Sequence, residues 1–145
     1  MEFFEDPPIP FYFTSEHEQF RAGLRDFVAR EITPHVNEWD EAETFPRALY
    51  GRVAEMGVLG LGYPEEYGGT PADVFYQLIV AEELARCGGG GVPASLSSHS
   101  IALPPILNAG SEEIKRRVMP SVLAGEKIVA LAVTEPSGGS DVASL

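Results

Sequence analysis

The chain has 145 residues, of which 44% are hydrophobic and 22% charged, values typical of one folded domain with a substantial core. Its 22 acidic side chains outnumber its 10 basic ones and give a formal net charge of −12. This balance argues against a nucleic-acid partner or an anionic membrane surface, since both need a basic face. With a single cysteine, Cys87, no targeting peptide and no apolar run of the roughly 20 residues that span a membrane, we expect a cytoplasmic protein.

The first part of the chain predicts an irregular lead-in followed by a helix. Residues 1–13 form the lead-in, because prolines recur there. The helix is predicted to begin at Ser15, which stands three residues before Glu18 as in a capping box. Apolar residues then recur at helical spacing, namely Phe20, Leu24, Phe27, Val28 and Ile32. Beyond Pro34 we expect a short helical continuation that carries Trp39.

Two further helices are predicted in the middle of the chain. One is expected to start near Pro46 and to stop at Gly57 in a left-handed conformation. A glycine-rich loop follows over residues 58–69, and Thr70 with Pro71 is predicted to open the next helix. In that helix the spacing places four apolar residues on one face, namely Val74, Leu78, Ala81 and Ala85.

The remaining elements complete a predicted all-α bundle of about five to six helices. An apolar helix over about residues 93–107 is expected to be buried on most sides and to be kinked or divided at Pro104 and Pro105. The last helix begins at Ser111, carries an apolar stripe through Val118, and ends at Gly125. The short β-branched run over residues 128–133 is predicted to be a strand.

A single strand has no ladder partner in the few residues that follow it. Unpaired backbone N–H and C=O groups make an isolated apolar strand unstable or adhesive. We therefore expect the chain to be a fragment that ends just inside a second, β-rich domain.

Several candidate sites are weak. His17, His35 and His99 share no metal-ligand spacing, so no metal site is expected, and His99 is interpreted as a core or pocket-wall residue. Cys87 has no neighbouring base and is interpreted as a small buried hydrophobe. The glycines at 57, 60 and 62 follow a helix rather than a strand, which excludes a dinucleotide fingerprint.

The strongest candidate is the run that starts at Leu131 and ends at Asp141. A strand that ends in Thr134 and continues into a glycine-bearing turn presents backbone N–H groups and hydroxyls. Such a nest suits a flat polar heterocycle and its phosphates, although an ordinary connection between strands accounts for the spacing equally well.

Residues 133–141, VTEPSGGSD, resemble the signature of the acyl-CoA dehydrogenase family, [LIVM]-T-E-x-x-x-G-S-D, without a gap. Weaker motifs of that family's N-terminal half occur in the same order, from about Thr14 to the end of the chain. They are EIxP at 31–34 with Trp39, MGxxG at 56–60, PEEYGG at 64–69, EELA at 82–85, SxH at 97–99, GxE at 110–112 and LAGE at 123–126.

This resemblance implies a helical domain over residues 14–126, and over residues 127–145 the first strand and flavin loop of an incomplete middle β-domain. The implied activity is the α,β-dehydrogenation of an acyl-CoA thioester, in which a glutamate removes the α-proton and the β-hydrogen leaves as hydride to FAD. That glutamate belongs to a part of the family fold beyond this segment, so no catalytic residue is expected here. Glu135 is interpreted as structural.

The resemblance also implies individual binding residues. The flavin ring would be bordered by Leu131, Ala132, Val133 and Thr134, with the Thr134 hydroxyl near its N5–O4 edge. Gly139 would belong to the same cofactor loop, and Ser140 would lie between the FAD phosphates and the pantetheine of the acyl-CoA. Ser97 and Ile101 are the hypothesised lining of the acyl pocket.

The implied partners are the acyl-CoA substrate, an electron-transfer flavoprotein, the missing β and C-terminal helical domains, and further copies in a homodimer or homotetramer. The substrate would come from fatty acid or branched-chain acyl metabolism. Two alternatives stay open. One is a flavin oxidase or monooxygenase of the same fold, and the other is a non-catalytic helical binding or scaffold subunit.

Overall fold

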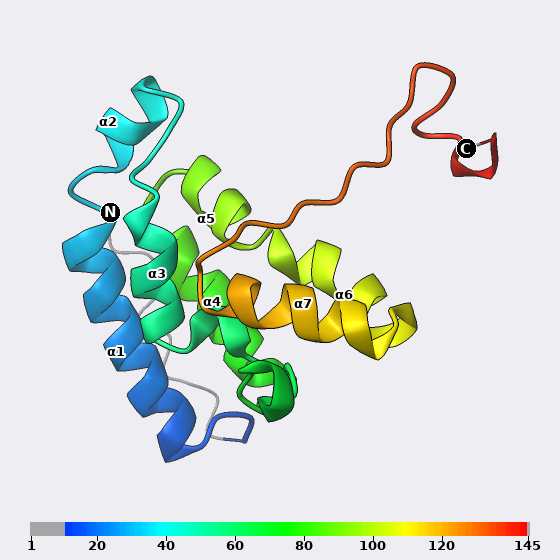
Figure 1. Cartoon of the computed structure of the whole chain (residues 1–145). Coiled ribbons are helices and arrows are strands. Elements are labelled where there is room, and N and C mark those ends of the chain that lie inside the picture. Colours follow the sequence, from blue (N-terminus) through cyan, green and yellow to red (C-terminus); the bar gives the residue numbers. More distant parts are fainter. Residues whose placement is uncertain (1–10, 145) are drawn as a thin grey trace.

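The computed structural model describes residues 11–144, and most of them lie in α-helices (Figure 1). The α-helices are α1 (Ser15–Glu31), α2 (Val36–Glu41), α3 (Ala48–Glu55), α4 (Val74–Ala85), α5 (Gly91–Leu96), α6 (His99–Ala109) and α7 (Glu112–Leu123). Short 3₁₀ helices occupy Val58–Gly60, Glu65–Tyr67 and Val142–Ser144. Within residues 11–144 the β structure is limited to two isolated bridges. The all-α class predicted from the sequence is confirmed.

The first helix begins where predicted, but a different pair of residues caps it. The Thr14 hydroxyl accepts a hydrogen bond from the His17 backbone N–H at 3.4 Å, and His17 Nδ1 accepts one from the Thr14 N–H at 3.0 Å. Ser15 is already the first helical residue, so the predicted box of Ser15 and Glu18 is wrong by one position. The Glu18 carboxylate instead lies 3.5 Å from Arg21 Nε.

The helix α4 begins later than predicted. Asp73 caps it by accepting a hydrogen bond from the Phe75 N–H at 2.9 Å. Thr70 is not part of the helix, because its backbone pairs with the preceding loop. The Thr70 N–H donates to the carbonyl of Gly60 at 2.8 Å, and its carbonyl accepts from the N–H of Gly62 at 2.8 Å. These bonds close the glycine-rich loop predicted over residues 58–69.

The apolar face that the spacing identified on α4 is exposed. Val74 retains 66% of its accessible surface and Leu78 retains 45%, whereas the buried residues are Ile79, Glu83 and Leu84. The buried face is therefore the neighbouring one, and α4 packs along α1. A charged residue on this buried face, described next, fixes which side of α4 is turned toward α1.

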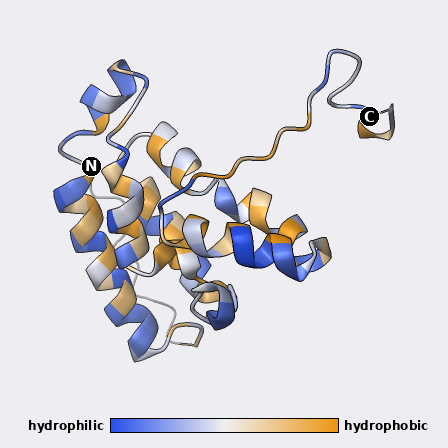
Figure 2. Cartoon of the chain, in the orientation of Figure 1, coloured by the Kyte–Doolittle hydropathy of each residue, from blue (hydrophilic) through white to orange (hydrophobic). Residues whose placement is uncertain are grey.

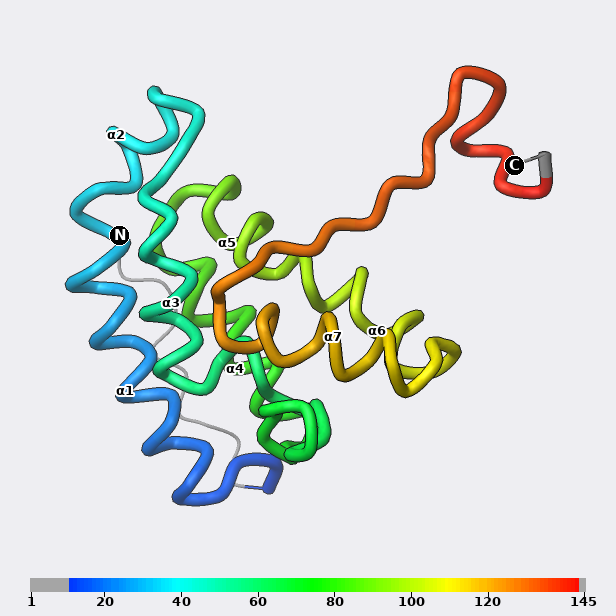
Figure 3. Tube along the Cα trace, viewed as in Figure 1, coloured from blue at the N-terminus to red at the C-terminus, as the bar shows by residue number. Residues whose placement is uncertain are grey.

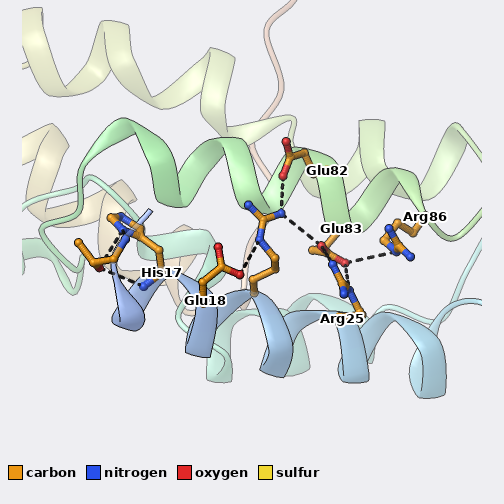
Figure 4. A network of polar contacts seen from close by, with 8 residues as sticks. His17, Glu18, Arg25, Glu82, Glu83 and Arg86 are labelled. Carbon is orange, nitrogen blue, oxygen red and sulfur yellow. Dashed lines mark hydrogen bonds and ion pairs between the residues drawn. The ribbon is translucent and has the colours of Figure 1, made fainter. Parts of the chain in front are cut away.

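That residue is Glu83, whose side chain is 1% exposed and lies among arginines (Figure 4). Arg25 donates two hydrogen bonds to its carboxylate, from Nη2 at 2.7 Å and from Nε at 2.9 Å. Arg86 Nε lies 3.5 Å away, and Arg21 Nη1 donates at 3.4 Å while also bonding the exposed Glu82. Burial alone would raise the pKa of Glu83, but these cations outweigh it and hold the pKa below its ordinary value.

The predicted fourth helix is two helices, and the break lies at Ser97 and Ser98 rather than at the prolines. The Ser100 hydroxyl donates to the Ser97 carbonyl at 2.7 Å, and the His99 ring donates from Nδ1 to the Leu96 carbonyl at 3.0 Å. Side chains thus take the carbonyls that a continuous helix would use, which favours a break. The two prolines lie inside α6.

The expectation that this apolar stretch is buried on most sides is wrong for the described chain. In α6 only Ala102 and Leu103 are fully buried, and Ile101 is 62% exposed. The helix α6 packs against α7, and Ile101 lies on its exposed side.

The last helix follows the prediction at both ends. The Ser111 hydroxyl accepts from the Ile114 N–H at 3.4 Å, and Gly125 has a φ of 73° just after the C-cap. Gly57 likewise has a φ of 77° after α3, as predicted. The buried side of α7 consists of Met119, Val122 and Leu123, which form a second core cluster with Tyr63, Tyr67 and Leu103.

The segment predicted to be a strand leaves the helical body as an extended chain (Figures 1 and 3). Residues 128–134 form no helix or ladder, and no backbone hydrogen bond joins them to another described residue. The described residues offer no second strand with which this segment could pair, so it belongs to no ladder here, and the strand stays a prediction. Figure 2 shows that this extended stretch is hydrophobic along its length.

Candidate functional site

The root of the extended segment is held by α3 and α7. After the left-handed Gly125, the backbone N–H groups of Glu126 and Lys127 both donate to the Ser121 carbonyl at 2.9 Å. The Arg47 guanidinium donates from Nη2 to the Glu126 carbonyl at 2.9 Å. These bonds set the direction in which residues 128–144 leave the body.

The candidate cofactor residues Leu131, Ala132, Val133 and Thr134 follow on this segment, and all four are exposed. The turn behind them is closed by two backbone hydrogen bonds. The Glu135 N–H donates to the Gly138 carbonyl at 2.8 Å, and the Gly138 N–H donates to the Glu135 carbonyl at 3.2 Å. Both groups of the Glu135 backbone thus shape the turn, which agrees with a structural role for this residue.

Gly139 and Thr134 are brought together by this turn. A Cβ atom built on Gly139 would lie 3.1 Å from Thr134 Cγ2 and 3.2 Å from Thr134 Oγ1. A larger residue at 139 would therefore press on the Thr134 hydroxyl. Ser140 follows in an exposed position, so its hydroxyl is accessible to a ligand.

Ser97 and Ile101, the residues hypothesised to line an acyl pocket, lie elsewhere. Ser97 is half-buried at the break between α5 and α6, and Ile101 is exposed on α6. The turn at residues 135–138 lies beyond the helices, away from both (Figure 1). In the described chain the structure thus groups Thr134 with Gly139 but does not bring Ser97 or Ile101 to them.

His99 lies beside a narrow cavity whose lining includes Tyr50, Leu59 and Val129. Its ring is satisfied by the Leu96 carbonyl. Burial lowers the pKa of His99, although hydrogen bonds to the backbone of Leu96 and Leu59 act in the opposite direction. His99 is thus a pocket-wall residue, as the sequence suggested.

A larger hollow of about 510 Å³ opens where α2, α3 and α5 meet the root of the extended segment. Its walls include Trp39, Phe45, Arg47 and Tyr50, and Ile128 forms part of its edge. The rings of Phe45 and Tyr50 stack at a centroid distance of 5.6 Å. The sequence pattern does not distinguish Phe45, Arg47 or Tyr50, because residues so close in the chain resemble an ordinary helix start.

Two classes of site have no support in the described part of the chain. Among residues 11–144 there is no group of three or more His, Cys, Asp or Glu side chains that could hold a metal ion. None of the helices described is both long and apolar enough to cross a membrane. The extended segment with its turn is the candidate binding element because the predicted cofactor residues Leu131 to Thr134 lie on it and are exposed.

Comparison with known proteins assigns the helical body to a family. Residues 14–126 match the model of the acyl-CoA dehydrogenase N-terminal domain. The long-chain specific acyl-CoA dehydrogenase of Sus scrofa mitochondria is 41% identical over 133 residues, which are 90% of this chain and 30% of that protein.

Solved structures show the same likeness. A probable acyl-CoA dehydrogenase from Mycobacterium abscessus is 42% identical with a TM-score of 0.83, over 89% of this chain and 35% of that one. An acyl-CoA dehydrogenase from Bacillus anthracis, solved in complex with FAD, is 34% identical with a TM-score of 0.79, over 94% of this chain and 23% of that one. The chain thus spans a third or less of the length of most of these relatives.

Proposed function

This chain belongs to the acyl-CoA dehydrogenase family, and we propose that it supplies the helical domain and the first flavin-binding segment of an FAD-dependent acyl-CoA dehydrogenase. The observation that carries the proposal is the ungapped motif at residues 133–141, which begins at the end of the extended stretch and continues into the turn closed by Glu135 and Gly138. We propose residues 14–126 as the helical domain and residues 127–145 as the start of a β-domain.

The exposed segment has the donor set that a flavin needs. Between Leu131 and Thr134 the backbone N–H and C=O groups make no hydrogen bond to other described residues, so they are available to a planar heterocycle. The hydroxyls of Thr134 and Ser140 are exposed beside them, and Gly139 keeps the space next to Thr134 free. FAD, when bound, supplies a two-electron acceptor.

The role of this chain in the proposed dehydrogenation is to bind and orient. Thr134 would donate its hydroxyl hydrogen to the edge of the flavin ring, where negative charge develops on reduction. Ser140 would hold phosphate or pantetheine oxygens, while Ser97 and Ile101 would contact the acyl tail. The base that removes the α-proton is assigned to a part of the enzyme beyond residue 145.

The same proposal covers the partners. An acyl-CoA is the substrate, an electron-transfer flavoprotein accepts the electrons, and the complete enzyme works as a homodimer or homotetramer in the cytoplasm. Oxygen uptake by the reduced enzyme separates this function from that of an oxidase, because a dehydrogenase passes its electrons to the flavoprotein instead.

The 145-residue chain alone is expected neither to retain FAD nor to oxidise an acyl-CoA. The described residues supply an exposed segment that can cover only one side of a flavin, and an open site loses much of the contact on which affinity depends. Visible absorbance of the purified chain after incubation with FAD and gel filtration tests this. Stoichiometric yellow flavin on the chain would contradict the expectation.

In a full-length enzyme that carries this segment, Thr134→Val is expected to make the flavin harder to reduce. The substitution keeps the branched shape and removes one hydrogen bond to a group that gains charge, a loss of about 1.5–3 kcal/mol. Ser140→Ala serves as the matched variant and should weaken the affinity for FAD or acyl-CoA while reduction of bound flavin is retained. Anaerobic titration with substrate, followed by flavin bleaching, measures both effects. Unchanged reduction in the first and unchanged affinities in the second would refute these assignments.

A further inference from the structure

The start of α3 borders two parts of the molecule to which the proposed function assigns different ligands. Its residue Tyr50 is 7% exposed and lines the narrow cavity beside His99. The lining of that cavity also includes Ser98, just before α6, and Ile128 and Val129 of the extended segment. Tyr50 therefore borders both the break between α5 and α6 and the root of the extended segment.

The hydroxyl of Tyr50 reaches the end of α5. It donates a hydrogen bond at 3.2 Å to the Ser95 carbonyl, which also accepts one from the Ser98 N–H at 3.3 Å. Because α5 ends one residue later, this carbonyl lacks the partner that a continuous helix would supply. Burial raises the pKa of Tyr50 although Arg47 acts in the opposite direction, so the hydroxyl keeps the proton that it donates. Tyr50 thus holds the backbone two residues before Ser97.

The same residue also supports the root of the extended segment, which leaves the body beside α3 (Figure 3). The Arg47 guanidinium lies 5.7 Å from the centre of the Tyr50 ring and donates from Nη2 to the Glu126 carbonyl at 2.9 Å. The backbone of Tyr50 makes a second contact, because a Cβ built on Gly125 would lie 2.5 Å from the Tyr50 carbonyl oxygen. Through its ring and its backbone, Tyr50 is therefore packed against the groups that fix where the extended segment begins.

We propose that Tyr50 is a positioning residue that holds the break between α5 and α6 in place relative to the root of the extended segment. The inference rests on the proposed function, which assigns acyl contacts to Ser97 and flavin contacts to residues 131–134. Reacting atoms must come within about 3–3.5 Å of each other, so the two binding regions must keep a fixed separation. Tyr50 acts on the acyl side through Ser95 and on the flavin side through Arg47.

Amide hydrogen exchange of the 145-residue chain, followed by NMR, tests both connections without any cofactor. Tyr50→Phe keeps the ring and removes the hydroxyl, so the Ser98 amide should exchange about fivefold faster. Arg47→Met should leave that amide unchanged and should speed exchange of the Glu126 and Lys127 amides instead. Tyr50→Leu removes both the hydroxyl and the ring, and it should speed exchange at both places. A change at only one place in Tyr50→Leu, or none in either of the other variants, would overturn the proposal.

Tyr67→Phe is the matched control for the loss of a buried hydroxyl. Tyr67 is 3% exposed, belongs to the second core cluster and donates its hydroxyl hydrogen to the Glu112 carboxylate at 3.0 Å. This variant should leave exchange unchanged both at the break and at the root. Arg47→Lys keeps a charged donor near the Glu126 carbonyl and should recover most of the protection that Arg47→Met loses. Exchange that rises in Tyr67→Phe as it does in Tyr50→Phe would mean a general loss of stability and would contradict the positioning role.

In a full-length enzyme that carries this segment, the same variants should separate substrate binding from flavin binding. Tyr50→Phe should raise the KM for an acyl-CoA about fivefold and leave the affinity for FAD unchanged, whereas Arg47→Met should weaken FAD binding at an unchanged KM. A native enzyme that holds no FAD and oxidises no acyl-CoA would refute the proposed function, and with it the role of Tyr50. An active native enzyme in which Tyr50→Phe leaves KM unchanged would refute the role of Tyr50 alone.

Discussion

Glu83→Gln is expected to destabilise the helical body by about 1.5–3 kcal/mol, the usual contribution of a hydrogen bond to a charged group. Glu83 is 1% exposed and accepts two hydrogen bonds from Arg25, with Arg21 and Arg86 also within reach. The amide would leave these cations without their shared counter-charge and would point N–H groups toward them. Since α1 and α4 pack along each other at this network, their packing should loosen first.

Urea unfolding followed by circular dichroism measures this loss. Glu82→Gln is the matched control, because Glu82 precedes Glu83 on α4 and bonds Arg21, but its side chain is 47% exposed. An exposed ion pair contributes about 1 kcal/mol or less, so the control should change stability little. Equal losses in the two variants would show that burial of the charge is not what matters here.

The same network should make the native chain sensitive to acid. The pKa of Glu83 is lowered on folding from its ordinary value of 4.5, since the arginines outweigh the opposing effect of burial. A lowered folded pKa means that the stabilisation is fully present above the unfolded value and is lost as the pH falls through the folded value. Stability of the native chain should thus fall as the pH drops below the ordinary value of 4.5, and Glu83→Gln should remove part of that dependence.

Gly125→Ala is expected to lower the free energy of unfolding by about 2–4 kcal/mol, because an unfavourable backbone conformation and a steric overlap combine. The φ of 73° lies in the left-handed region that disfavours residues with a Cβ. That Cβ would also lie 2.5 Å from the Tyr50 carbonyl oxygen and 2.9 Å from the Gly51 nitrogen, both backbone atoms of α3. The end of α7 would have to move away from α3, and the root of the extended segment would move with it.

Gly57→Ala separates the two penalties. Gly57 has a similar φ of 77°, but a Cβ there would meet nothing within 4 Å. The free energy of unfolding of this variant should therefore fall by only about 1–2 kcal/mol, the cost of the left-handed conformation. Thermal unfolding of both variants measures the difference, and a Gly125→Ala chain as stable as Gly57→Ala would mean that α7 does not press on α3.

Much of the helical fold could be predicted because its signals are local. The cap at Ser111 and the left-handed stops at Gly57 and Gly125 depend on residues within one turn, and the structure confirms all three. The family motif at 133–141 is likewise a contiguous string. Its turn is closed by hydrogen bonds between Glu135 and Gly138, which are near neighbours in the chain.

Three features were not predicted, one of them local and two dependent on parts distant in the chain. The break between α5 and α6 lies at hydroxyl and imidazole side chains, which compete for backbone carbonyls more effectively than the two prolines disrupt the helix. The hollow beside Trp39 arises only where α2, α3 and α5 meet. The residues proposed to bind flavin stay apart from those proposed to bind the acyl chain, because the extended segment leads away from the helices α5 and α6 (Figure 1).

The sequence by itself determined most of the helices, the cap at Ser111 and the family, since these follow from neighbouring residues and from an ordered set of short motifs. Only the tertiary structure decided which face of α4 is buried, because Glu83 meets Arg21 and Arg25 across about sixty residues of chain. It also decided the state of residues 128–134. Their propensity favours a strand, but a strand requires hydrogen bonds from a second one, and no described residue of this chain provides them.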